Sequence, residues 1–261
     1  MILKREASNI ETDYIYVDMY VGSCINKYGI NKTQEIINNF SGEQRFFICQ
    51  HIYVHKLNFE DSIVFSPHSH IDDQVISIPH YTLTSNHKNN SQRNLLFSFI
   101  GSVKTYPLRA KIVQKYNHCF DTGVKWAVDA ELSATVKNYF KQKYIDLANR
   151  SVFSLCPRGA GISTIRLFES MSMGSIPVII ADGFSRPMED FLDWNEFSIT
   201  INESDVDKIE DELKSVHQGK IKAMQKKVRK VYSQYFSNDK LPEAILKEIQ
   251  GKRRLFPDDC L

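Results

Sequence analysis

The sequence lacks several features that mark common classes of protein. No run of about 18 consecutive apolar residues occurs, so nothing predicts a membrane-spanning helix. The charged residues near the N-terminus have no apolar run behind them, so they are not typical of a secretory signal. The formal net charge is only +2 and the basic residues are spread along the chain, which argues against a nucleic-acid-binding protein.

Cysteines are few and scattered. They form neither a CxxC pair nor a zinc-finger spacing, and their positions are Cys24, Cys49, Cys119, Cys156 and Cys260. An odd, dispersed set in a chain of 261 residues predicts reduced thiols. We therefore expect a cytoplasmic protein.

Two familiar nucleotide-binding signatures are also missing. No glycine-lysine pair is followed by serine or threonine, so there is no P-loop lysine, and the full dinucleotide fingerprint is absent. These absences weaken an assignment as an ATPase or a dehydrogenase. The composition itself, 42% hydrophobic and 25% charged, is typical of a globular protein with a sizeable core.

Predicted strands and helices alternate along the chain. Before a polar stretch at 84–94, strands are predicted at 13–20, 45–50, 62–65 and 74–78, with a break at Gly22 and Ser23 and a helix at 32–39. After that stretch, strands are predicted at 95–101, 151–155 and 176–180, and helices at 107–116, 130–150, 165–173, 205–217 and 221–232. Such alternation predicts parallel sheets and an α/β architecture with two Rossmann-like lobes facing a cleft.

The polar stretch is the best linker candidate, so we predict a small N-terminal lobe over 1–90, a C-terminal lobe over 91–240 and a tail over 241–261. No internal repeat is apparent.

The strongest chemical signal lies between residues 151 and 170. A predicted strand runs into a loop that contains Arg158, Gly159 and Gly161, and Ser163 or Thr164 is expected to cap the helix that follows. Free backbone N–H groups and the helix dipole favour an anion at such a helix N-terminus.

Arg166 lies three residues after Ser163 and three before Glu169, so the three share one helical face. An arginine fork suits a diphosphate and a carboxylate suits ribose hydroxyls, without a metal ion. An ordinary ion pair between Arg166 and Glu169 explains the same spacing, and the spacing alone does not decide between the two.

Several segments resemble the exostosin glycosyltransferase domain. The similarity is specific in Cys156-Pro-Arg-Gly159, Arg166-Leu-Phe-Glu169 and Gly174-Ser-Ile-Pro-Val-Ile-Ile-Ala-Asp182, and it continues through 187–194 and 197–205. It is looser upstream, at 12–17, 45–51, 73–79 and 96–101 with Arg109. The resemblance covers roughly residues 12 to 235.

The resemblance implies a GT-B fold, with a nucleotide-sugar donor bound mainly by the C-terminal lobe and a glycan acceptor on the N-terminal side. It implies transfer from a UDP-sugar, usually with inversion, and no cofactor. Arg158 and Arg166 would neutralise the leaving diphosphate. Backbone N–H groups from Gly159 to Ser163 and Thr164 would help them. Glu169 would hold the ribose, Gly101 would admit the ligand to a strand end, and Arg109 is a further phosphate candidate.

An inverting transfer needs a general base, and three residues of the predicted N-terminal lobe are candidates. Asp18 interrupts an apolar strand, whereas Asp73 and His51 flank predicted strand ends. The assignment among them stays open. The donor sugar also stays open, with xylose, glucuronic acid, galactose and arabinose all used in the family.

Other readings of the chain are weaker or belong to another class. The run His68-Ser-His-Ile-Asp-Asp73 suggests metal ligands on one strand face, but a polar loop is the better explanation without a third ligand at fixed spacing, and we predict no metal site. A nucleotide- or glycan-binding module that has lost catalysis remains the alternative to an enzyme. The sequence shows no N-terminal membrane anchor of the kind typical of animal and plant members, which suits a soluble microbial or viral form.

Overall fold

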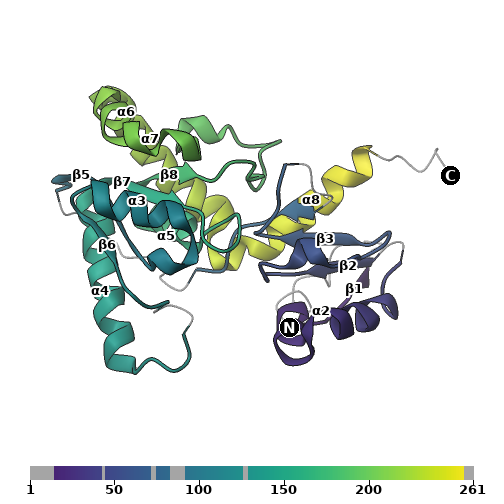
Figure 1. The fold of residues 1–261 in the computed structure, drawn as a ribbon. Coiled ribbons are helices and arrows are strands. Elements are labelled where there is room, and N and C mark those ends of the chain that lie inside the picture. Colours follow the sequence, from purple (N-terminus) through teal and green to yellow (C-terminus); the bar gives the residue numbers. More distant parts are fainter. Residues whose placement is uncertain (1–14, 43–44, 72–74, 83–91, 126–128, 256–261) are drawn as a thin grey trace. The chain divides into compact units, whose positions relative to one another are not determined.

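The computed structural model describes residues 15–42, 45–71, 75–82, 92–125 and 129–255. The chain divides into two compact units (Figure 1). The first contains 1–80, 183–192 and 238–261, and the second contains 81–182 and 193–237. The segments 183–192 and 238–261 therefore belong with the N-terminal unit, which the sequence did not indicate.

The first unit is built on a parallel four-stranded sheet in the order β1-β2-β3-β4. Its strands are β1 (Ile15–Tyr16), β2 (Arg45–Ile48), β3 (Ile63–Ser66) and β4 (Val75–Ser77). Phe46 pairs with Ile63 and Phe65 with Ile76 in the ladder. Phe47 and Phe65 are fully buried, so this short sheet carries the core of the unit.

Helix α2 (Val21–Asn38) is the next element after β1. The sequence predicted a break at Gly22 and Ser23 and a helix only from residue 32, and this prediction was wrong. The helix begins at Val21 and is kinked at Gly29, whose φ of 79° lies in the left-handed region that glycine tolerates. The predicted helix is therefore the second half of a longer, kinked one.

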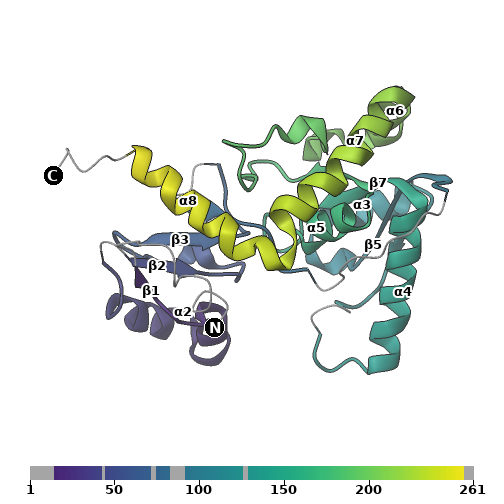
Figure 2. The ribbon, with the colours of Figure 1, turned by 180° about the vertical axis from the view of Figure 1, so that it is seen from behind.

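Two distant segments complete the first unit. The backbone N–H of Ile71 donates to the Gly183 carbonyl at 3.0 Å, and that of Ser185 donates to the Ser69 carbonyl at 3.1 Å. Helix α8 (Leu241–Leu255) lies against the sheet, where Ile245 belongs to a core cluster with Phe65 (Figure 2). The residues that the sequence set apart as a tail thus include a packed helix.

The second unit contains a parallel five-stranded sheet in the order β6-β5-β7-β8-β9. Its strands are β5 (Leu95–Gly101), β6 (Cys119–Asp121), β7 (Ser151–Pro157), β8 (Ile176–Ile180) and β9 (Ile199–Thr200). All five residues of β8 are buried, as expected for a parallel strand covered on both faces.

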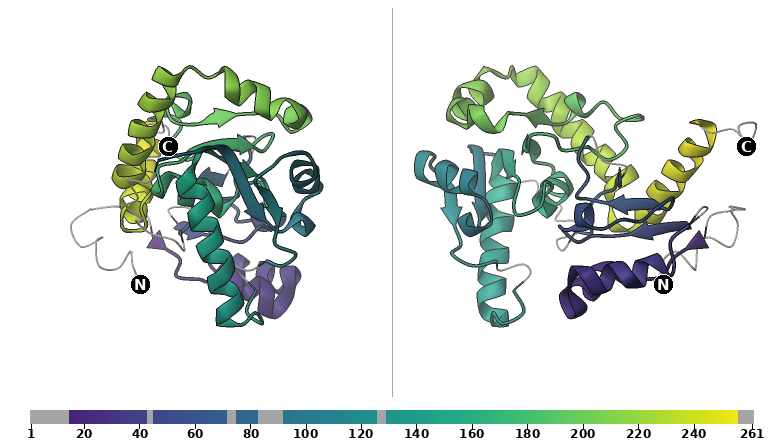
Figure 3. Two further views of the ribbon diagram at one scale, coloured as in Figure 1. Left: turned by 90° about the vertical axis from the view of Figure 1, so that its left-hand side faces the viewer. Right: turned by 45° about the vertical axis from the view of Figure 1, so that its right-hand side comes forward.

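The helices of the second unit surround this sheet (Figure 3). They are α3 (Pro107–Lys115), α4 (Ala134–Arg150), α5 (Ile165–Ser172), α6 (Ile209–Ser215) and α7 (Gln218–Val231), with a π-helical turn at Tyr232–Phe236 and short 3₁₀ helices at Val103–Thr105, Trp194–Glu196 and Glu203–Lys208. Ser133 caps α4 by accepting from the Val136 N–H. Trp194 is buried and stacks on Phe236, whose ring centroid lies 5.5 Å away.

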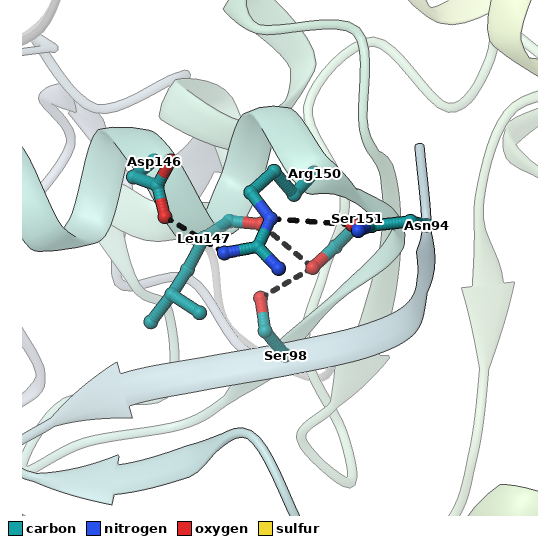
Figure 4. A network of polar contacts seen from close by, with 6 residues as sticks. All are labelled: Asn94, Ser98, Asp146, Leu147, Arg150 and Ser151. Atoms are coloured by element: carbon teal, nitrogen blue, oxygen red, sulfur yellow. Dashed lines mark hydrogen bonds and ion pairs between the residues drawn. The ribbon is translucent and has the colours of Figure 1, made fainter. Parts of the chain in front are cut away.

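The junction between α4 and β7 is tied to strand β5 by side chains (Figure 4). The Ser151 hydroxyl donates to the Leu147 carbonyl at 2.7 Å and is hydrogen-bonded to the Ser98 hydroxyl, also at 2.7 Å. Nearby, Arg150 bonds Asn94 at 3.2 Å and Asp146 at 3.3 Å. The contacts of the Ser151 hydroxyl hold the start of β7 against β5.

The two parallel sheets confirm the predicted α/β class and give each lobe the Rossmann-like build that a GT-B fold requires. Most predicted strands and helices are present with shifted ends. The short strands β6 and β9 and helix α8 were missed.

Within the described residues, no helix is long and apolar enough to cross a membrane. The described cysteines, which exclude Cys260, are free thiols.

Arg93 links three chain segments of the second unit. Its guanidinium donates to the carbonyls of Ala148, Ser151 and Met173 at 2.8, 2.5 and 2.7 Å, at the carboxyl ends of α4 and α5. A cation at the carboxyl end of a helix is favourable for two reasons. It donates hydrogen bonds to the free carbonyl groups, and its positive charge interacts with the negative end of the helix dipole.

We expect Arg93→Met to lower the free energy of unfolding by about 2–3 kcal/mol, because three carbonyls lose a charged donor. The matched control is Arg150→Met, which removes a side chain that is 41% exposed and should cost less than about 1 kcal/mol. Urea unfolding followed by tryptophan fluorescence measures this free energy, since Trp194 is buried in the second unit. Equal losses in the two variants would contradict the linking role of Arg93.

Candidate functional site

The strand order of the second sheet creates a switch point between β5 and β7. The chain leaves β5 toward β6 on one side, whereas it leaves β7 toward β8 on the other. In open parallel sheets, ligands bind outside the carboxyl ends of the strands at such a point, because the diverging loops leave a crevice there. The loops that meet here follow Gly101 and Pro157.

Gly101, the last residue of β5, makes room for Arg166. A Cβ atom at this position would lie 2.7 Å from the Arg166 Nη2 atom, so a side chain here would force the guanidinium to move. The Arg166 guanidinium donates to the Ile100 carbonyl and lies over the Phe99 ring, 4.6 Å from its centroid. The sequence predicted that Gly101 admits a ligand, and the structure shows that it admits an arginine.

Arg109 braces the loop that follows β7. From helix α3 its guanidinium donates to the carbonyls of Arg158 at 2.8 Å, Pro157 at 3.0 Å and Ser102 at 3.4 Å. A Cβ atom on Gly159 would approach Arg109 to 3.2 Å, so the loop sits tightly on this side chain. Burial, and then the nearby Arg166 charge, lower the pKa of Arg109 to about 9, which leaves it charged at neutral pH.

Arg158 projects from the same loop and is partly exposed. Its guanidinium lies over the Tyr106 ring at 4.7 Å, and its Nη1 atom is 4.0 Å from the Glu203 carboxylate. Tyr106 precedes α3 and Glu203 follows β9. Tyr106 and Glu203 were not predicted as site residues from the sequence, although each flanks the end of a strand or the start of a helix.

Helix α5 begins differently from the prediction. Thr164 occupies the N-cap position but its side chain makes no capping hydrogen bond, and Ser163 lies before the helix. The predicted cap at Ser163 or Thr164 thus falls on Thr164, but without a capping bond from its side chain. The first turn of α5 keeps its backbone N–H groups without a side-chain acceptor, which is the condition for anion binding at a helix N-terminus.

Buried polar atoms without a hydrogen-bond partner gather at this edge of the sheet. They are Ser102 Oγ, Arg158 Nε, Ser163 Oγ and Arg166 Nε. Ser163 and Arg166 are only 6% and 8% exposed. Unsatisfied buried donors are costly, so a group of them at one edge indicates that an acceptor-rich ligand completes them.

Glu169 lies deeper, on the next turn of α5, and is 4% exposed. Its neighbour is the buried Tyr144, whose pKa is raised well above its usual value by burial and then by the Glu169 charge. The Arg166 guanidinium is 5.7 Å from the Tyr144 ring. The ribose contact expected of Glu169 stays a prediction, since the described contacts place this carboxylate against Tyr144.

Two of the three predicted base candidates lie at the carboxyl edge of the first sheet. Asp18 is exposed and lines a cavity of about 660 Å³ together with Tyr16 and Tyr20. His51 lines a neighbouring cavity of about 440 Å³ that shares both tyrosines. Asp73 lies outside the described residues.

The local bonding of His51 limits what it can do. Its Nδ1 atom accepts from the Tyr53 N–H at 3.2 Å, and burial lowers the pKa of His51, so the ring is neutral at pH 7. With Nδ1 accepting, the proton resides on Nε2, which makes that nitrogen a donor. Asp18 has both carboxylate oxygens available as acceptors and fits a base better.

The structure offers little to a metal ion. Among the described side chains, no group of three or more histidine, cysteine, aspartate and glutamate residues could hold one. His68 and His80 stack edge to face at 5.0 Å, and Asp72 lies outside the described residues. The chain has one Asp-X-Asp triplet, Asp205 to Asp207, whose carboxylates pair with Lys208 at 2.7 Å and Lys115 at 2.9 Å.

Comparison with known proteins gives concordant results. The Exostosin GT47 domain family matches residues 29–216. Exostosin-1 homolog of Caenorhabditis elegans is 30% identical over 122 residues, 45% of this chain and 32% of that protein. Exostosin-1b of Danio rerio is 28% identical over 125 residues, 48% of this chain and 17% of that protein. The matched regions thus span a third or less of these relatives.

Among solved structures, the crystal structure of TarM aligns with a TM-score of 0.42 and 11% identity, over 83% of this chain and 56% of that chain. The family match includes β2 to β9, and with them the switch point and its arginines. The chain belongs to the exostosin GT47 domain family.

Proposed function

We propose that this protein is a glycosyltransferase that moves a sugar from a UDP-sugar to a hydroxyl group of a glycan. The observation that carries the proposal is the group of unpartnered buried donors at the β5–β7 switch point. A diphosphate has enough acceptor oxygens to satisfy the Arg158, Arg166 and serine donors together. Family membership supports the same conclusion.

The chemistry requires that charge on the leaving group be stabilised. The acceptor oxygen forms a bond to the anomeric carbon, while the bond from that carbon to the phosphate oxygen breaks and its electron pair leaves with UDP. Arg158 and the N–H groups at the start of α5 would bind the oxygens where this negative charge develops. Arg166 would add a second positive charge from a fixed position against Phe99.

We further propose that the transfer inverts the anomeric centre and needs no metal ion. Inversion follows if the acceptor attacks directly from the face opposite the diphosphate. A base then takes the acceptor proton, and Asp18 is the described candidate whose acceptor atoms are not already used. Metal independence is supported by the arginines, which supply the positive charge that a divalent ion would otherwise provide.

The donor sugar and the acceptor belong to the same proposal. Xylose is one of the sugars that the family transfers and remains a candidate here. The acceptor is a glycan or glycoconjugate. A panel of UDP-sugars, scored by release of UDP with and without acceptor, identifies both.

UDP binding tests the site directly. In the presence of EDTA, UDP should raise the thermal midpoint of the protein, because it binds only the folded state. Arg158→Ala should weaken UDP binding about ten- to a hundredfold, since charge-assisted hydrogen bonds of about 1.5–3 kcal/mol are lost. Arg186→Ala removes an arginine of similar exposure that pairs with Glu189 and is the matched control.

An unchanged UDP affinity in Arg158→Ala, or equal losses in both variants, would remove Arg158 from the site. A folded wild-type protein that binds no UDP would refute the proposal. UDP binding without sugar transfer would instead identify a binding module of the same fold.

Variants of the base candidates separate Asp18 from His51. Asp18→Asn should lower kcat of transfer by about 10²- to 10⁴-fold while UDP affinity stays unchanged, because only proton removal from the acceptor is lost. His51→Gln should lower kcat much less, since its Nε2 serves as a donor. The reverse order of effects would assign His51 as the base, and two small effects would direct attention to Asp73.

A further inference from the structure

Glu203 is held by three hydrogen bonds at the edge of the second sheet, two to its carboxylate and one from its backbone. Its Oε2 atom accepts from the Tyr106 hydroxyl at 2.8 Å, and its Oε1 atom accepts from the Asp182 backbone N–H at 3.2 Å. The Glu203 backbone N–H in turn donates to Asp182 Oδ1 at 3.0 Å. This carboxylate is therefore fixed both at its tip and at its backbone.

The partners come from different loops of the same edge. Asp182 follows β8, Glu203 opens the 3₁₀ helix after β9, and Tyr106 stands at the start of α3 after β5. Because parallel strands end at one edge, residues far apart in the sequence meet there. The hydrogen bond to Glu203, and then burial, raise the pKa of Tyr106, so its hydroxyl remains a donor at neutral pH.

Arg158 lies beside the Glu203 carboxylate but donates no hydrogen bond to it. Its Nη1 atom is 4.0 Å from Glu203 Oε1, too far for a hydrogen bond, and its Nε atom is buried without a partner. The Tyr106 ring lies under the guanidinium at 4.7 Å. The arginine is thus oriented by charge and stacking while its N–H groups stay available.

We propose that Glu203 is a positioning residue that holds Arg158, together with Tyr106, in the orientation that receives the phosphate groups of the donor. The identity of the ligand in this inference rests on the proposed function. The orientation of Arg158 by Glu203 and Tyr106 does not depend on it. A long arginine side chain loses much rotamer freedom when it is ordered. Ordering it before the ligand arrives raises the affinity, because that loss no longer accompanies binding.

The first test needs no ligand. Phenylglyoxal modifies accessible guanidinium groups, and peptide mass mapping gives the rate at Arg158. Glu203→Gln keeps the size and the acceptor oxygen but removes the charge, and it should raise this rate about two- to fivefold, the range of a weak ion pair. Arg186 in the same sample is the internal reference and should react at an unchanged rate.

Tyr106→Phe separates the hydrogen bond from the ring. It keeps the stacking surface under Arg158 and removes only the hydroxyl that anchors Glu203. It should raise the Arg158 rate less than Glu203→Gln does. An unchanged Arg158 rate in Glu203→Gln would overturn the positioning role.

The second test is a double-mutant cycle on UDP affinity. Glu203→Gln should weaken UDP binding about three- to fivefold in the wild-type background and leave it unchanged in the Arg158→Met background, because the effect passes through Arg158. A purely structural role predicts equal losses in the two backgrounds, and that result would overturn the proposal. Tighter binding in Glu203→Gln would also overturn it, since Glu203 would then compete with phosphate.

Failure of this inference is distinguishable from failure of the proposed function. If wild-type protein binds no UDP, the proposed function fails, and the modification rates alone decide whether Glu203 orients Arg158. If UDP binds and the cycle is additive, the site stands and the role of Glu203 falls.

Discussion

The parallel pairing of β5 with β7 determines where every other part of the candidate site lies. Phe97 pairs with Phe153 in this ladder, so the two strands end at a common edge, where Gly101 and Arg158 begin diverging loops. The hydroxyl contacts of Ser98 and Ser151 fix the start of the pair. Tyr106, Asp182 and Glu203 reach the same edge because their loops follow or border strands of the same sheet.

Three arginines occupy this edge, and their charges must be tolerated before any ligand arrives. Backbone carbonyl oxygens stabilise two of these charges by accepting hydrogen bonds from Arg109 and Arg166. The Phe99 ring also lies beneath both guanidinium groups. Arg158 instead has the Glu203 carboxylate and the Tyr106 ring. Arg109 is therefore committed to the protein, whereas Arg158 and the Nε atom of Arg166 keep donors for a ligand.

The sequence was most informative where chemistry and structure use neighbouring residues. The run from β7 through α5 to β8 was predicted almost to its ends, because a buried parallel strand is continuously apolar and the loop glycines mark its end. The prediction failed at α2, because Gly22 and Ser23 normally interrupt a helical pattern. Here the helix continues through both residues, since tertiary packing outweighs their low helix propensity. The prediction also failed at β6, β9 and α8, whose short or terminal patterns carry too little periodicity.

The sequence by itself determined the α/β class, the position of the arginine-bearing loop and the family resemblance, since these depend on local patterns of side chains. Only the tertiary structure decided that Gly101 accommodates Arg166, that Arg109 braces the loop, and that Glu203 stands beside Arg158. These are contacts between residues that lie 45 to 65 positions apart. Their proximity in space is set by the order of strands in the sheet, which no local sequence pattern encodes.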